Sequence, residues 1–141
     1  MNFLRIFLAA LAAFVVYMAF GGIAFAALPS LKTEFLKYPA VYRDQSGQMS
    51  HMPIGMLGLF VSMGALAVLY VYSYQGGSGL AAGARFGAIV GVFALGAFVL
   101  HNYVNLNVGL AGTLQQCVMY FIEWTLVGIV IGLVYRPALA H

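Results

Sequence analysis

A glutamate and a histidine stand well inside long apolar stretches of this chain, and they are the residues best suited to chemistry. Glu123 is the only acidic residue in any apolar segment, and His101 lies in the apolar segment before it. A carboxyl group and an imidazole that meet can exchange a proton, bind a polar ligand or hold each other by a hydrogen bond. The sequence therefore directs attention to a polar site inside an apolar protein.

Helical counting groups further polar residues with these two. At 100° per residue, Asn105 lies about 40° from His101, while Gln116 and Tyr120 share one side of the next helix with Glu123. A rise of ~1.5 Å per residue places His101 ~12 Å before the connecting turn and Glu123 ~16 Å after it. We therefore predict a ligand- or proton-binding site made of Glu123, His101, Asn105, Tyr120 and Gln116, with no catalytic residue.

The position of Glu123 allows two interpretations. A charged acid at the bilayer centre costs at least ~2.5 kcal/mol, so Glu123 should be partnered, exposed to water or protonated. A protonated acid could simply hydrogen-bond a neighbouring helix, or it could bind a ligand or handle protons. His101 is open to the same two interpretations.

Composition defines the elements that must position these residues. Of the 141 residues, 64% are hydrophobic and 6% charged, and the mean hydropathy is +0.99. Such a chain is an integral membrane protein, and four runs are long enough to span a bilayer. We predict an all-α, four-transmembrane-helix up-down bundle forming one domain over residues 1–141. The spans are 3–28, 52–74, 80–108 and 113–135, with an extramembrane loop at 29–51.

Glycines recur at steps of four on the third and fourth spans. The set comprises Gly83, Gly87, Gly91, Gly128 and Gly132. Small residues at this spacing let helix backbones approach closely. Counting puts the three glycines of the third span on the face of His101 and Asn105, which should point inward. The two glycines of the fourth span lie roughly opposite Glu123, which predicts a docking face for a second copy or for another membrane protein.

Metal and cofactor sites have weak signals. Met49, His51 and Met52 could hold Cu(I), because thioethers and imidazole are suitable ligands, although methionine is also a common filler of apolar helices. His101 could ligate a heme. No zinc spacing occurs, and Cys117 is the only cysteine. We therefore predict no cofactor.

The few charges bear on partners and topology. The net charge of +3 comes from scattered bases, so nucleic-acid binding is not expected and the lipid bilayer is the expected surrounding. An even number of spans puts both termini on one side, and Arg5 and Arg136 at the outermost ends favour the cytoplasmic side. Within the loop, a short helix is expected from Leu31 to Tyr38.

Several motifs resemble those of a known group. The run from Gly79 to Gly87, the mid-span Glu123, the pair Gly128 and Gly132, and the ending Tyr135-Arg136-Pro137 resemble a family of small bacterial four-span inner-membrane proteins classed as a domain of unknown function. The resemblance implies a bacterial inner-membrane bundle and names no activity.

Three classes of function follow from these observations. The first is a small binding or transport-type protein whose intramembrane polar site surrounds Glu123 and His101. The second is a structural or accessory subunit that docks in a larger membrane complex through glycine-rich helix faces. An enzyme is less favoured, because no activated nucleophile, metal cluster or phosphate loop accompanies the polar residues.

Overall fold

The computed structural model describes residues 2–135, with Phe35 described by its backbone alone, and this part is helical without strands. The elements are α1 (Phe3–Ala27), α2 (Pro29–Leu36), α3 (Gln45–Ser73), α4 (Gly79–Ala94), the π-helix η1 (Leu95–Leu100), α5 (His101–Asn105) and α6 (Leu110–Val134). Four helices are long and apolar enough to cross a membrane, because α4, η1 and α5 form one continuous helix. The predicted all-α four-span membrane bundle is confirmed.

The second long helix begins earlier than the predicted span. Asp44 caps the start of α3, because its carboxyl group accepts the Gly47 backbone N–H at 2.8 Å and the Ser46 hydroxyl at 2.8 Å. These hydrogen bonds, the Gly47 N–H first, hold the pKa of Asp44 below its usual value. The predicted loop 29–51 is therefore shorter, and it contains the helix α2.

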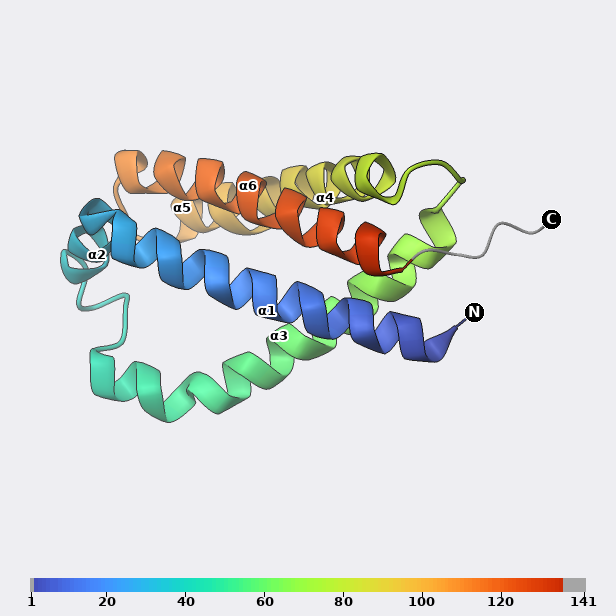
Figure 1. Cartoon of the computed structure of the whole chain (residues 1–141). Coiled ribbons are helices and arrows are strands. Elements are labelled where there is room, and N and C mark those ends of the chain that lie inside the picture. The colour runs from blue at the N-terminus through green and yellow to red at the C-terminus, as the bar shows by residue number, and fades with distance from the viewer. Residues whose placement is uncertain (1, 136–141) are drawn as a thin grey trace.

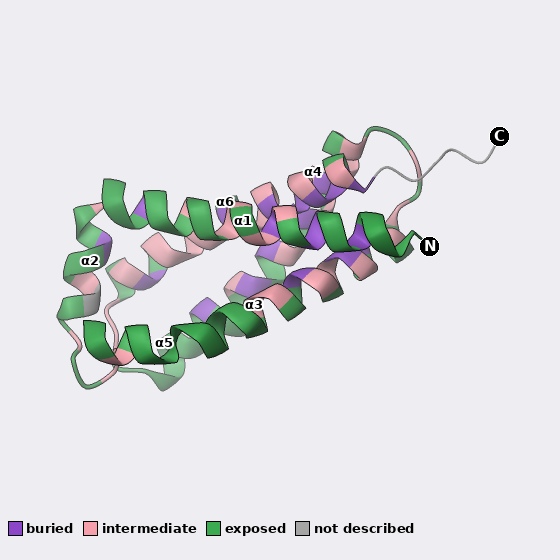
Figure 2. Ribbon diagram, turned by 60° about the horizontal axis from the view of Figure 1, so that its bottom comes forward, coloured by how far each residue is buried: buried purple, intermediate pink, exposed green. Residues whose placement is uncertain are grey.

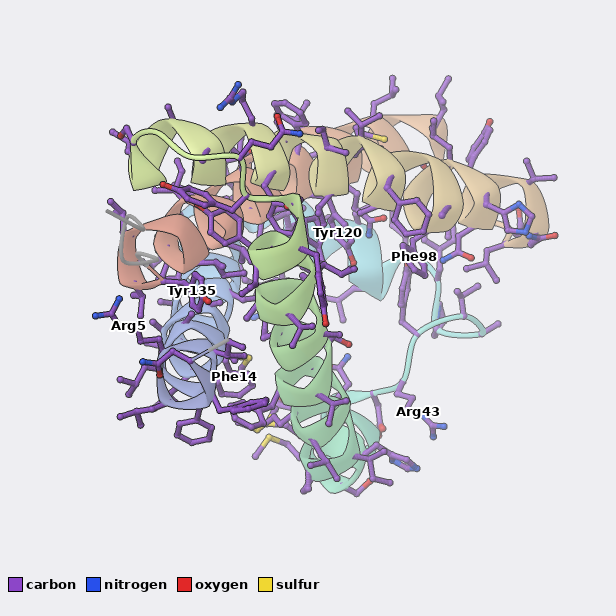
Figure 3. The ribbon with its side chains drawn as sticks, turned by 90° about the vertical axis from the view of Figure 1, so that its right-hand side faces the viewer. Arg5, Phe14, Arg43, Phe98, Tyr120 and Tyr135 are labelled. Atoms are coloured by element: carbon purple, nitrogen blue, oxygen red, sulfur yellow. The ribbon has the colours of Figure 1, made fainter. Side chains whose placement is uncertain are left out.

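The long helices follow one another in the order α4, α6, α1 and α3 across the bundle (Figure 1). α4 lies along α6, while α1 contacts both α6 and α3. α3 crosses α1 obliquely, so only its second half contacts the bundle, and every residue from 48 to 58 is exposed (Figure 2). Phe60 marks the start of the contact, with its ring edge-on to Phe7 and Phe14 of α1. Phe14 is labelled in Figure 3.

The core lies at the end of the bundle where α1 begins. Four buried or nearly buried small and aliphatic residues of α1 meet Met63, Ala67 and Tyr70 of α3 there. Val127 and Ile131 of α6 complete the core. The other end of the bundle has fewer buried residues, so the polar residues described below lie where the packing is looser.

The glycines of α4 and α6 face each other within the chain. A Cβ atom added at Gly87 would lie 2.5 Å from the Trp124 carbonyl oxygen and 2.8 Å from the Thr125 Cα atom. Gly83 lies against the Gly128 carbonyl group in the same way. The predicted docking face at Gly128 and Gly132 is therefore wrong. Both glycine rows are used in one internal contact, where each supplies the space that the other backbone needs.

We expect Gly87→Ala to destabilise the protein by about 1–3 kcal/mol, because the added methyl group meets backbone atoms that cannot move aside. The matched control is Gly58→Ala on α3, where an added Cβ atom would have no neighbour within 4 Å. Thermal unfolding in detergent, followed by circular dichroism, measures both. Equal stability of the two variants would contradict the assignment of this contact.

Candidate functional site

The carboxyl group of Glu123 is buried between α6 and α1. The side chain is only 6% exposed. Gly21 of α1 lies opposite, where an added Cβ atom would be 3.6 Å from Glu123 Oε1. The absence of a side chain at Gly21 lets the acid lie directly against the backbone of α1. The face of α6 that carries Glu123 is thus the one facing away from the glycine contact with α4.

Two tyrosines complete the surroundings of Glu123. Tyr17 precedes Gly21 by about one turn of α1, and Tyr120 precedes Glu123 by about one turn of α6. Their hydroxyl groups lie near each other and near the Glu123 carboxyl group. The Tyr17 ring also lies 5.4 Å from the Trp124 ring, centroid to centroid. Three side chains able to exchange or bind protons therefore meet within the apolar bundle.

A row of polar residues leads from this cluster toward α2. Gln116 lies one turn before Tyr120 and lines a small pocket together with Glu34 and Tyr42. Tyr42 also lies on the side of Tyr120. Because Gln116, Tyr120 and Glu123 recur at helical spacing on one side of α6, they cover roughly 10 Å along that helix. The predicted grouping of Gln116, Tyr120 and Glu123 on one side agrees with this geometry.

The acidic side chain that lies against the first turn of α6 belongs to Glu34 of α2. An added Cβ atom at Gly112 would lie 2.6 Å from Glu34 Cγ and 3.0 Å from Glu34 Oε1, so the carboxyl group sits against the helix start. The N-cap residue of α6 is Gly109, which has no side chain that could accept a hydrogen bond from the first turn. A negative charge at a helix N-terminus is favourable, and Lys37 Nζ donates to Glu34 Oε2 at 2.7 Å. That hydrogen bond raises the pKa of Lys37.

A second contact joins the same two helices, α2 and α6. Gln115 Nε2 donates a hydrogen bond to Ser30 Oγ at 2.9 Å.

His101 and Asn105 lie away from this site. Both are exposed, and Asn105 Nδ2 donates to the backbone carbonyl of His101 at 3.0 Å. The expectation that they share the inward glycine face and meet Glu123 is wrong. The count of 100° per residue does not hold across η1, where one extra residue per turn displaces the following side chains by about 100°. Their predicted roles in binding stay predictions.

The sequence analysis missed Tyr17 and Glu34. Tyr17 lies within a stripe of alanines and glycines, which predicts helix contact and gives no sign of a polar neighbour. Glu34 lies in a connecting segment, and only the folded chain brings it to α6, 75 or more residues later in sequence. The sequence offered one signal for Glu34. A glycine stands at the start of α6, where a capping side chain is usual, so an acid from another segment could lie there.

The residues considered for copper are at the start of α3. Met49 and Met52 line a large cavity, described below, whereas His51 Nδ1 lies 2.8 Å from the Gly47 carbonyl oxygen of its own helix. Within residues 2–135, no three His, Cys, Asp or Glu side chains are grouped to hold a metal ion. Copper near His51 and heme at His101 stay weak predictions.

The chain matches no protein-family model, no curated protein and no solved structure. Inferences about function therefore depend on the geometry of the site.

We expect Gly21→Leu to disturb the site, because the larger side chain must displace the Glu123 carboxyl group. Overpacking of this kind costs about 1–3 kcal/mol. The neighbouring Gly22→Leu is the matched control, since an added Cβ atom there has no neighbour within 4 Å. The fluorescence of Trp124, the only tryptophan, and thermal unfolding measure the effect. A larger change in Gly22→Leu than in Gly21→Leu would contradict the placement of Glu123.

Replacing the acid at the start of α6 tests the contact between α2 and α6. Glu34→Gln keeps the shape of the side chain and removes its charge, so we expect a loss of about 0.3–1 kcal/mol from the helix-dipole interaction. Lys37→Gln removes only the exposed partner and should change stability less. Chemical unfolding of both variants at low salt provides the comparison. The reverse order would show that Glu34 acts mainly through Lys37.

Proposed function

We propose that the protein is a small multi-pass membrane protein of the binding or transport type, and that the carboxyl group of Glu123 is its intramembrane site. One observation carries the proposal: an acid only 6% exposed lies beside two tyrosine hydroxyl groups within a bundle of apolar helices. Ionisable residues inside membrane spans usually mark pathways or binding sites for ions, protons or polar substrates. Tyr17 and Tyr120 replace His101 as the proposed partners of Glu123.

The row of polar residues supports the handling of protons. Gln116 and Tyr120 stand about one turn apart on α6 and extend from the α2 end toward Glu123. Amide and hydroxyl groups both donate and accept hydrogen bonds, so such a row can carry a proton or hold water molecules that do so. We propose that Glu123 exchanges its proton with the side of the membrane where α2 lies.

The cellular location belongs to the same proposal. An even number of spans would place both termini on one side of a bacterial inner membrane, and Arg5 near the N-terminus favours the cytoplasmic side. Arg136, the other base behind this expectation, lies outside the described residues. In this orientation α2 and the Glu34 pair would lie on the opposite side.

The alternative, an accessory subunit of a larger complex, loses the feature that suggested it. The glycine rows of α4 and α6 are occupied by each other, so a partner or a second copy would have to bind other surfaces. The alternative stays a prediction, as does a homo-oligomer.

Replacing Glu123 by glutamine tests the proposal. Glu123→Gln keeps the size and hydrogen-bonding capacity of the side chain but cannot release a proton. In vesicles that contain a pH-sensitive dye, we expect the unmodified protein to carry protons under an imposed potential and Glu123→Gln to carry them at least ~10-fold more slowly, about 1.4 kcal/mol in barrier height.

The matched control is His101→Gln, which changes an exposed ionisable residue of another helix and should keep the flux. Thermal unfolding shows whether each variant is folded. Equal proton flux through the unmodified protein and Glu123→Gln would overturn the proposal. So would a proton flux through the unmodified protein that is no greater than the flux in protein-free vesicles.

A further inference from the structure

A large cavity lies at the end of the bundle that carries α2. Its volume is about 870 Å³, and it is an open cavity lined by the end of α1, by α2, by the segment 37–44 and by the start of α3. Ligand-binding cavities in proteins commonly have volumes of ≈ 300–1,000 Å³. This cavity is separate from the Glu123 carboxyl group, and only Tyr42 lines both it and the pocket beside Gln116.

Two basic side chains line the cavity without an acidic partner. Lys32 of α2 and Arg43, which lies on the segment leading into α3 (Figure 3), are both exposed. Among the described residues, the one ion pair joins Lys37 to Glu34, so neither base is neutralised by it. The single acid of the lining, Asp44, accepts the Gly47 N–H and the Ser46 hydroxyl group. The lining therefore carries a net positive charge.

Most of the remaining surface of the cavity is apolar, although Tyr42, Gln45 and Gln48 also line it, and the apolar part continues onto the exposed surface of α3. Phe25, Leu36, Met49 and Met52 contribute to the cavity, and residues 48–58 of α3 are exposed throughout. On the same side, α1 diverges from α3 toward its end (Figure 1).

We propose that this cavity binds an anionic phospholipid. Lys32 and Arg43 would hold the phosphate group, since an arginine can donate two parallel hydrogen bonds to phosphate oxygens. Phe25, Met49 and Met52 would contact the acyl chains. The cavity lies at the ends of two membrane-spanning helices, which is the level of the lipid head groups, and basic pockets at this level bind anionic head groups.

The combination of charge and apolar surface favours a lipid over a free anion. A soluble phosphate compound would use Lys32 and Arg43 but would leave the apolar part of the cavity in contact with water. A phospholipid fills both parts at once. The site is independent of proton exchange at Glu123, so either proposal can fail without the other.

Lipid binding to the purified full-length protein tests the proposal. The protein in detergent is titrated with phosphatidylglycerol, with phosphatidylcholine of the same acyl chains, and with glycerol phosphate, and bound molecules are counted by native mass spectrometry. We expect phosphatidylglycerol to bind at least ~10-fold more tightly than either of the others, a difference of about 1.4 kcal/mol.

Variants then locate the binding site. Lys32→Gln with Arg43→Gln should lower phosphatidylglycerol affinity at least ~10-fold, a difference of about 1.4 kcal/mol. Arg85→Gln removes an exposed base from α4, outside the cavity, and should leave the affinity unchanged. Glu123→Gln should also bind the lipid normally, which separates this result from the test of proton flux. Thermal unfolding confirms that each variant is folded.

Four results would overturn the proposal. Equal binding of phosphatidylglycerol and phosphatidylcholine would show that the bases do not select the head group. Glycerol phosphate binding as tightly as the lipid would assign the site to a soluble anion. Unchanged lipid binding in the double variant, or an equal loss in Arg85→Gln, would place the lipid elsewhere.

Discussion

The close contact between the backbones of α4 and α6 determines how the rest of the chain is arranged. Gly83 and Gly87 on one helix and Gly128 on the other leave no room for side chains between them. In lipid, where burial of apolar surface does not drive helices together, such close packing supplies much of the attraction. Because this contact uses one side of α6, the opposite side is left for α1, and that side carries Glu123.

The division of α6 into two sides explains why polar residues can lie inside so apolar a protein. One side makes backbone contact with α4 and carries glycine where the two helices come closest. The other side meets α1 at Gly21 and Tyr17, where a missing side chain and a hydroxyl group accommodate the acid. Trp124 contributes to both sides, with its carbonyl group toward Gly87 and its ring against Tyr17. The glycine contact and the polar cluster are therefore adjacent parts of one helix.

Hydropathy and helical spacing were sufficient to predict the four spans and the shared face of Gln116, Tyr120 and Glu123. They were not sufficient for His101, because the sequence Leu95–Leu100 gives no sign that the helix widens into a π-helix. They also left open which glycine row faces which helix, since spacing identifies a face but not its neighbour. The positions of Glu34 and Tyr17 beside α6 result from contacts between segments that are distant in sequence. A periodic pattern within one segment cannot predict such contacts.

Pro53 gives α3 a property that follows from its place in the helix. It lies inside α3, where it has no N–H to donate to the residue four positions earlier, so one backbone hydrogen bond is missing there. The turns before Pro53 are capped by Asp44 and make no contact with the core, whereas the turns after residue 58 pack against α1. Bending at this proline would move Met49 and Met52 and leave the core undisturbed. A bend at this one helical turn would therefore change the width of the cavity.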